Sequence, residues 1–227
     1  MNIGNVAVSL QGKGRKNNED SYFADPNIGL LIVSDGMGGH NAGEVASALA
    51  ARTLCETLRD MQPSADALTR GYLAANSAVF ARQKEDETLS GMGTTMTALW
   101  EDQEYVFVGQ IGDSRAYLLR DRKLTRLTHD HTEVNRLKSM GLLSDEEAKN
   151  HPDRSMLHKY LGMQYDDLII TPEYVPYTPQ AGDRLLLCSD GLTDMLGDEQ
   201  IEQTLLVSRT ATTATKNLIN RALEAGG

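Results

Sequence analysis

Amphipathic stretches at two places in the chain predict two pairs of helices. The first pair covers residues 44–60 and the stretch that begins after Pro63, and the second covers residues 198–207 and 213–224. Ser64 is the kind of residue that caps a helix N-terminus. In the helix after it, apolar residues recur with the period of one helix face, at Leu68, Tyr72, Ala75 and Val79.

Shorter apolar or alternating stretches predict strands. Turn residues rather than long connections separate most of them, which favours antiparallel pairing. The predicted strands cover residues 5–9, 21–24, 30–35, 94–100, 105–108, 116–119, 124–127, 168–170 and 184–189. Together with the helix pairs, this order predicts an α+β fold, an antiparallel β-sandwich flanked by pairs of helices in α-β-β-α layers. No linker divides the chain, so we expect residues 1–227 to form one domain.

Residues 128–161 differ in character, because they are polar and contain only short helical pieces. One of these pieces begins with Ser144-Asp145-Glu146-Glu147, which has the sequence of a capping box. The segment has little apolar content, which predicts a surface subdomain or flap. His129 and His131 could suggest a transition metal, but no third nitrogen or sulfur ligand accompanies them. We therefore expect exposed flap histidines.

The composition narrows the choice of partners and location. The formal net charge is −10 and no run of Lys or Arg occurs, which argues against nucleic acid or an anionic membrane surface as a partner. No segment approaches membrane-spanning length, and the first residues lack the pattern of a signal peptide, so a cytoplasmic location is expected. The two cysteines, Cys55 and Cys188, are expected to be buried, reduced thiols.

Two apolar strands end in the same three residues, Ser34-Asp35-Gly36 and Ser189-Asp190-Gly191. Paired carboxylates repel each other unless a cation or a shared proton relieves the repulsion. A hard divalent metal held by oxygen ligands would relieve it. Single Asp-Gly pairs mostly mark turns, and Asp25 and Asp183 are interpreted in that way. Further acids follow other strands or lie in turns, namely Glu19, Asp20, Asp113 and Asp194.

The acids belong to longer motifs, which follow one another along nearly the whole chain: Arg15-x-x-Asn18-Glu19-Asp20, Asp35-Gly36-Met37-Gly38-Gly39-His40-x-Ala42-Gly43-Glu44, Gly93-Thr94-Thr95, Gly112-Asp113-Ser114-Arg115, His151-Pro152-x-Arg154 with Leu161-Gly162, and Ser189-Asp190-Gly191-Leu192-x-Asp194. In this order they resemble the motifs of the metal-dependent serine/threonine protein phosphatases, the type 2C or PPM family, in its bacterial form.

The resemblance implies a centre of two Mn²⁺ or Mg²⁺ ions in a cleft between two sheets. Asp35 would bridge the ions, and the Gly36 carbonyl would bind one of them. Asp20 and Asp190 would complete the coordination directly or through water, and Glu19 would hold a water at the centre. Asp113 with Asp190 or Asp194 resembles a third metal site. Arg15 would bind the substrate phosphate, and His40 is either the general acid or merely an exposed histidine.

The resemblance also implies phosphorylated substrate proteins, made by a Ser/Thr kinase, and a monomeric enzyme. Cysteine-dependent phosphatases need Arg six positions after the cysteine, whereas Met61 and Asp194 occupy those positions here. The sequence departs from the family pattern at one point. After a Gly-Gly pair the family continues with Asp-Asn and a last strand, whereas the sequence given ends at Gly226-Gly227. The alternative is therefore a catalytically weakened enzyme, or a non-catalytic regulatory or binding module on the same fold.

Overall fold

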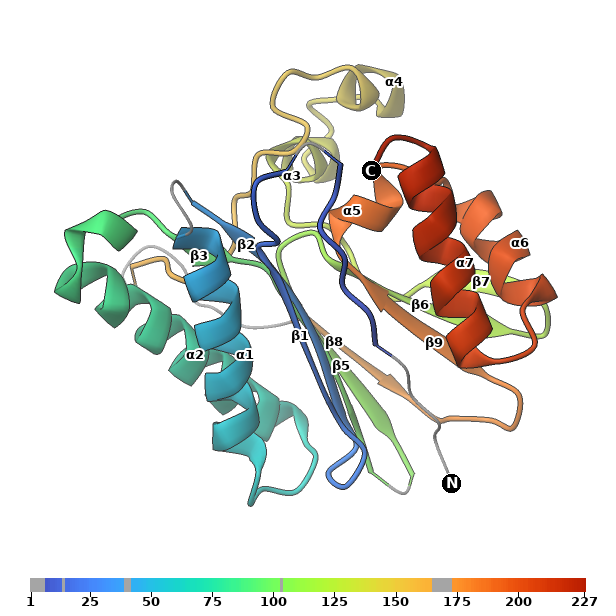
Figure 1. The fold of residues 1–227 in the computed structure, drawn as a ribbon, viewed down its shortest axis with the longest axis horizontal. Coiled ribbons are helices and arrows are strands. Elements are labelled where there is room, and N and C mark those ends of the chain that lie inside the picture. Colours follow the sequence, from blue (N-terminus) through green and yellow to red (C-terminus); the bar gives the residue numbers. More distant parts are fainter. Residues whose placement is uncertain (1–6, 14, 39–41, 103, 165–172) are drawn as a thin grey trace.

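The computed structural model describes residues 7–13, 15–38, 42–102, 104–164 and 173–227. It contains two packed antiparallel sheets (Figure 1). The larger sheet has the strand order β1-β2-β4-β5-β8, and β3 pairs with the end of β2. Its strands are β1 Asp20–Asp25, β2 Leu30–Met37, β3 Gly93–Thr94, β4 Met96–Glu101, β5 Val106–Ile111 and β8 Glu173–Tyr177.

The smaller sheet has the order β7-β6-β9, formed by Lys123–Arg126, Arg115–Arg120 and Arg184–Cys188. A two-residue turn joins β6 to β7, and Asp121 and Arg122 in it have φ angles of 49° and 66°. Positive φ at both central residues is the geometry of the tight turn that matches the twist of a hairpin. The antiparallel sandwich predicted from the turns is confirmed.

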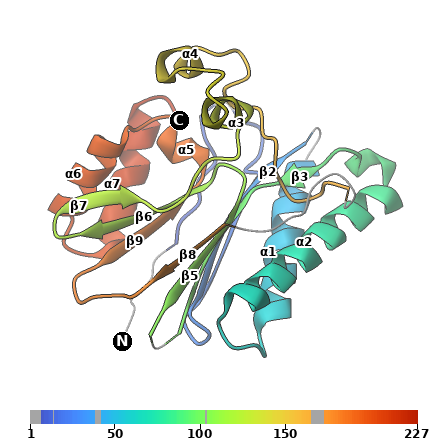
Figure 2. The ribbon, with the colours of Figure 1, turned by 180° about the vertical axis from the view of Figure 1, so that it is seen from behind.

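Two helix pairs cover the outer faces of the sandwich (Figures 1 and 2). Helices α1 Ala42–Leu58 and α2 Ala65–Glu85 pack on the larger sheet, while α6 Asp198–Val207 and α7 Ala211–Glu224 cover the smaller one. The Ser64 side chain caps α2 by accepting a hydrogen bond from the Ala67 N–H. The shorter helices are η1 Glu87–Leu89, α3 Glu133–Ser139, α4 Asp145–Lys149 and α5 Asp190–Thr193.

The core consists of three apolar layers, because successive side chains of a strand point to opposite faces of the sheet. On β4, Trp100 packs with α1 and α2, whereas its neighbour Leu99 packs between the two sheets. The third layer fills the space between the smaller sheet and helices α6 and α7, around Ile201 and Leu218. All four residues predicted for the buried face of α2 are fully buried.

Two strand predictions differ from the structure or lie outside the described residues. The predicted strand 5–9 is wrong where it is described, since residues 7–9 belong to no strand, and residues 5 and 6 are outside the described part. Strand prediction 168–170 lies entirely outside the described residues. Strand β8 was not predicted, because Pro176 in its sequence lowers strand propensity. Proline is nevertheless accepted at a sheet edge, where β8 lies.

The flap segment holds α3 and α4, which stand beyond one end of the sandwich (Figure 1). The predicted capping box of α4 is present, with reciprocal bonds between Ser144 and Glu147. The prediction that His131 is exposed is wrong: this side chain is 4% exposed, while His129 is exposed as predicted. Leu161 is fully buried in the main core. The two ends of the segment are therefore anchored in the sandwich, and only its middle projects.

Both cysteines are buried free thiols, as predicted. Within the described ranges, no helix has the length and apolarity needed to cross a lipid bilayer.

Candidate metal centre

Asp20 and Asp35 face each other across the β1–β2 ladder. They are register partners at the end of this antiparallel pair, so their side chains lie on the same face of the sheet. Two like charges in directly opposed positions destabilise a sheet. The first predicted pair of metal ligands is therefore brought together by strand register alone.

The backbone beside this pair is packed unusually tightly. A Cβ atom on Gly36 would lie 2.0 Å from the Gly43 carbonyl oxygen and 2.7 Å from that of Glu19. The Gly36 N–H donates to the Glu19 carbonyl at 3.1 Å, and the same carbonyl accepts the Ser47 hydroxyl at 2.6 Å. The start of α1 is thus pressed against the strand ends that carry Glu19, Asp20 and Asp35.

Asp190 reaches the same place from the other sheet. It is the first residue of α5, two residues after the last residue of β9. The preceding residue, Ser189, donates its hydroxyl hydrogen to Asp20 Oδ2 at 2.9 Å and so joins the two sheets at the acid cluster. Sequence reasoning missed this role of Ser189, although the repeated Ser-Asp-Gly motif contained it.

The acids strongly perturb one another. Burial, followed by the charges of Asp20 and Asp190, raises the pKa of Asp35 from 3.8 to about 10. Burial also raises the pKa of Asp20, against the effect of its hydrogen bond from Ser189. At neutral pH the metal-free cluster is therefore relieved by a proton on Asp35.

Arg15 lies beside this cluster on an exposed segment before β1. Its guanidinium is close enough to Asp20 to lower the pKa of that carboxyl group. Arg15, Asp20, Asp35 and Asp190 line one cavity of about 620 Å³, which also contains Gly36 and Glu19. The predicted phosphate-binding residue and the predicted ligands thus share one open space.

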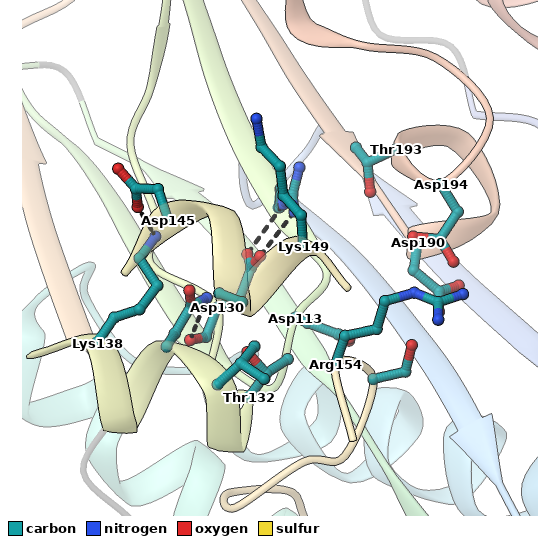
Figure 3. Close-up of a pocket in the computed structure, with 15 residues that line it drawn as sticks. Asp113, Asp130, Thr132, Lys138, Asp145, Lys149, Arg154, Asp190, Thr193 and Asp194 are labelled. Carbon is teal, nitrogen blue, oxygen red and sulfur yellow. Dashed lines mark hydrogen bonds and ion pairs between the residues drawn. The ribbon is translucent and has the colours of Figure 1, made fainter. Parts of the chain in front are cut away.

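Asp113 and Asp194 lie on the flap side of Asp190. They line a second cavity with it, of about 360 Å³, which Figure 3 shows with Arg154 extending toward Asp190 and Asp194. Burial and the Asp190 charge raise the pKa of Asp113 to about 7 and also raise that of Asp194. The two cavities adjoin at Asp190 and Asp194, which line both of them.

The loop that carries Asp113 is fixed by a partly buried ion pair that the sequence did not reveal. Arg115 makes two hydrogen bonds to Asp130, at 2.9 and 2.7 Å. His131 also holds the loop. Its ring Nδ1 accepts the Gly112 N–H, and its backbone N–H donates to the Gly112 carbonyl. The remaining predicted site residue, His40, lies outside the described residues.

The donor set fits a hard divalent cation. Carboxylates gathered from two sheets, with backbone carbonyls nearby, provide the oxygen ligands that Mg²⁺ and Mn²⁺ accept. Among the described residues, no group of three or more His, Cys, Asp or Glu side chains is placed, as the structure stands, where it could hold a metal ion. The fit therefore rests on donor chemistry and on the mutual repulsion that a cation would relieve.

We expect the metal-free protein to lose stability as the pH rises from about 4 toward 10. The folded pKa of Asp35 lies above its ordinary value of 3.8, so the folded state holds a proton that the unfolded state has released across this window. Melting temperatures in EDTA at pH 5, 7 and 9 measure the effect. Asp35→Asn should flatten the slope, and a melting temperature of the parent chain that rises over this range would contradict the assignment.

Comparison with known proteins gives a consistent result. A family model described as protein phosphatase 2C matches residues 13–225. Over 98% of its length, the chain is 43% identical to the serine/threonine protein phosphatase PstP of Mycobacterium tuberculosis, and it spans only 42% of that protein. The serine/threonine phosphatase stp of Listeria monocytogenes is 35% identical, with 96% of the chain and 88% of the relative covered.

Solved structures agree. A crystal structure of M. tuberculosis PstP superposes with a TM-score of 0.87 at 40% identity, covering 96% of this chain and 91% of that one. The PstP catalytic domain in complex with two manganese ions superposes with a TM-score of 0.83 at 39% identity, covering 96% and 90%.

Proposed function

We propose, because the chain belongs to the protein phosphatase 2C family, that it hydrolyses phosphoserine and phosphothreonine by direct attack of water on phosphorus. The observation that carries the proposal is the convergence of Asp20, Asp35 and Asp190 from two sheets in one cavity with Arg15. An arginine beside a cluster of carboxylates is suited to a substrate that is itself an anion and to a reaction that uses cations.

The residues proposed to hold two Mn²⁺ or Mg²⁺ ions are Asp20, Asp35, Asp190 and the Gly36 carbonyl, with Glu19 acting through water. Asp113 and Asp194 are the proposed additional ligands of a third ion. The two manganese ions in the related PstP catalytic domain support the choice of metal. When bound, such ions supply a nucleophile from water at neutral pH and stabilise the charge of the phosphoryl group.

The side chains of the protein have separate tasks in this proposal. The planar guanidinium of Arg15 binds two phosphoryl oxygens and orients the phosphorus toward the acid cluster. Asp35 must give up its proton before it can bind a cation, which couples metal binding to proton release. His40 is the proposed donor of a proton to the departing hydroxyl group of the substrate.

The proposed substrates are phosphorylated proteins, the products of a Ser/Thr kinase, and we place the reaction in cytoplasmic signalling by a monomeric enzyme. The described part of the flap lies next to the cavity of Asp113 and Asp194. It is the proposed surface against which a protein substrate rests, while a small phosphate ester needs only the acid cluster and Arg15.

The test is phosphate release from phosphoserine, phosphothreonine and phosphotyrosine peptides by EDTA-stripped protein, before and after Mn²⁺ is added. Hydrolysis of the first two peptides, only with metal, is the expected result. If calorimetry shows that Mn²⁺ binds but no peptide is hydrolysed, the chain is a non-catalytic binding module on this fold.

Arg15→Ala should lower kcat/KM by about 10- to 100-fold while the bound metal is retained. Hydrogen bonds to a charged group contribute roughly 1.5–3 kcal/mol, and their loss weakens the binding of both the substrate and the transition state. Arg15→Lys should recover part of this loss, because it keeps the charge but not the two-pronged geometry. Arg70→Ala removes another exposed arginine, on α2, and serves as the control. A fall in metal content with unchanged KM would make Arg15 structural.

A further inference from the structure

The motif Gly93-Thr94-Thr95 has no task in the function proposed above, yet it lies against the acid cluster. Thr95 is 3% exposed and follows the short strand β3. Its hydroxyl oxygen accepts the Asp35 N–H at 3.0 Å, and its own N–H donates to the Asp35 carbonyl at 2.8 Å. The main chain of Asp35 is therefore held on both sides by one residue.

The same hydroxyl reaches the loop that carries Asp113. Thr95 Oγ1 lies 2.7 Å from Ser114 Oγ, and Ser114, the residue after Asp113, is fully buried. The Gly112 side of the loop is equally close, because a Cβ there would lie 2.5 Å from Thr95 Cβ. One hydroxyl thus joins the segments that carry two acids from different parts of the chain.

Other hydrogen bonds also hold this loop, but they do not link it to Asp35. The Ser114 carbonyl accepts hydrogen bonds from Thr97 Oγ1 at 2.6 Å and Gln110 Nε2 at 3.1 Å. Those bonds fix the loop to strands β4 and β5, but neither involves the main chain of Asp35. Within the part of the chain that the structure describes, the Thr95 hydroxyl alone contacts both the Asp35 N–H and the Ser114 side chain.

We propose that Thr95 is a positioning residue whose hydroxyl fixes Asp35 relative to Asp113 and so determines how tightly the acid cluster binds divalent metal. The inference rests on the metal centre proposed above. Hydrogen-bond partners behind metal ligands hold them in place, and the loss of one typically costs 10- to 100-fold in metal affinity. A buried hydroxyl bonded on two sides is such a partner, because its removal leaves buried polar groups without a hydrogen bond.

The test is calorimetric titration of the metal-free protein with Mn²⁺, which does not depend on phosphatase activity. Thr95→Val keeps the shape of the side chain but removes the hydroxyl, and should weaken Mn²⁺ binding by about 10-fold. Thr95→Ser restores the hydroxyl and should bind Mn²⁺ within about 2-fold of the parent chain. If the valine variant binds as tightly as the parent, or the serine variant as weakly as the valine variant, the proposal is wrong.

Two further variants separate positioning from general destabilisation. Thr204→Val removes another buried, hydrogen-bonded hydroxyl, on α6 far from the acids, and should lower the melting temperature without changing Mn²⁺ affinity. Ser114→Ala breaks the connection at its other end, so the Thr95→Val/Ser114→Ala double variant should lose less affinity than the product of the single losses. Multiplicative losses, or an equal loss in Thr204→Val, would overturn the inference.

Failure of the inference differs visibly from failure of the proposed function. If the metal centre itself is misassigned, the parent chain takes up no Mn²⁺ in the same titration. If only the role of Thr95 is misassigned, the parent chain binds Mn²⁺ and the valine variant binds it equally well.

Discussion

Asp35→Asn is expected to lower phosphate release by roughly 100-fold or more, and treatment of the parent chain with EDTA should do the same. A divalent cation contributes several kcal/mol to charge stabilisation in such a reaction, and each 1.36 kcal/mol is a factor of ten in rate. Asp35 is the best candidate to carry this effect, because it interacts with Asp20, Asp190 and Asp113 at once. Initial rates on a phosphothreonine peptide, measured for both chains over a range of Mn²⁺ concentrations, give the ratio of the two rates of phosphate release.

The same variant should be more stable than the parent chain when both are metal-free. Asparagine is neutral without taking up a proton, so it is buried in the acid cluster at a lower cost than Asp35, and a loss of activity would not result from unfolding. Asp25→Asn is the matched control, since Asp25 lies at the other end of β1 and accepts hydrogen bonds within its own turn. Undiminished phosphate release from the EDTA-treated protein, or from Asp35→Asn, would contradict the proposed metal-dependent mechanism.

Gly36→Ala is expected to destabilise the fold by about 3 kcal/mol or more, because overpacking against backbone leaves no side chain that can move aside. The added methyl group would lie 2.0 Å from the Gly43 carbonyl oxygen. Relief requires that α1 moves away from β2, which also displaces the Gly36 carbonyl. For a chain of this size we expect the melting temperature to fall by roughly 6–12 °C.

Gly197→Ala provides the comparison for that measurement. A Cβ at Gly197 meets nothing within 4 Å, and its φ of −70° suits any residue. This variant should melt close to the parent chain, and Mn²⁺ affinity should fall only in Gly36→Ala. Equal melting temperatures for the two variants would show that α1 and β2 adjust easily to the extra methyl group.

Local patterns predicted much of the fold, because they depend on neighbours in sequence. The apolar period of α2, its Ser64 cap and the capping box of α4 are all contained within one or two helical turns. The acids of the site were also recognisable, since Asp35 and Asp190 follow apolar strands with the same three-residue ending. Antiparallel register then places Asp20 opposite Asp35 with no further information.

What escaped prediction depends on partners far away in the chain. His131 is buried because its ring accepts the Gly112 N–H, and nothing near residue 131 in the sequence indicates that partner. Strand β8 forms because β5 offers it a ladder, despite the proline in its sequence. Thr95 precedes β4 in the sequence and Ser114 follows β5, so only the folded sandwich brings these two residues into contact.

The division of the acids between two sheets has a thermodynamic consequence. Asp20 begins β1 and Asp35 lies opposite it on β2 in the larger sheet, whereas Asp190 follows β9 of the smaller one. A cation bound by both sets would join the sheets at the end where the apolar layer between them stops. Ligand linkage would then add about 2.7 kcal/mol to the free energy of unfolding at a metal concentration 100 times the dissociation constant. Separation of the sheets and release of the ions would be one event, so the resistance of the fold to opening would follow the supply of metal.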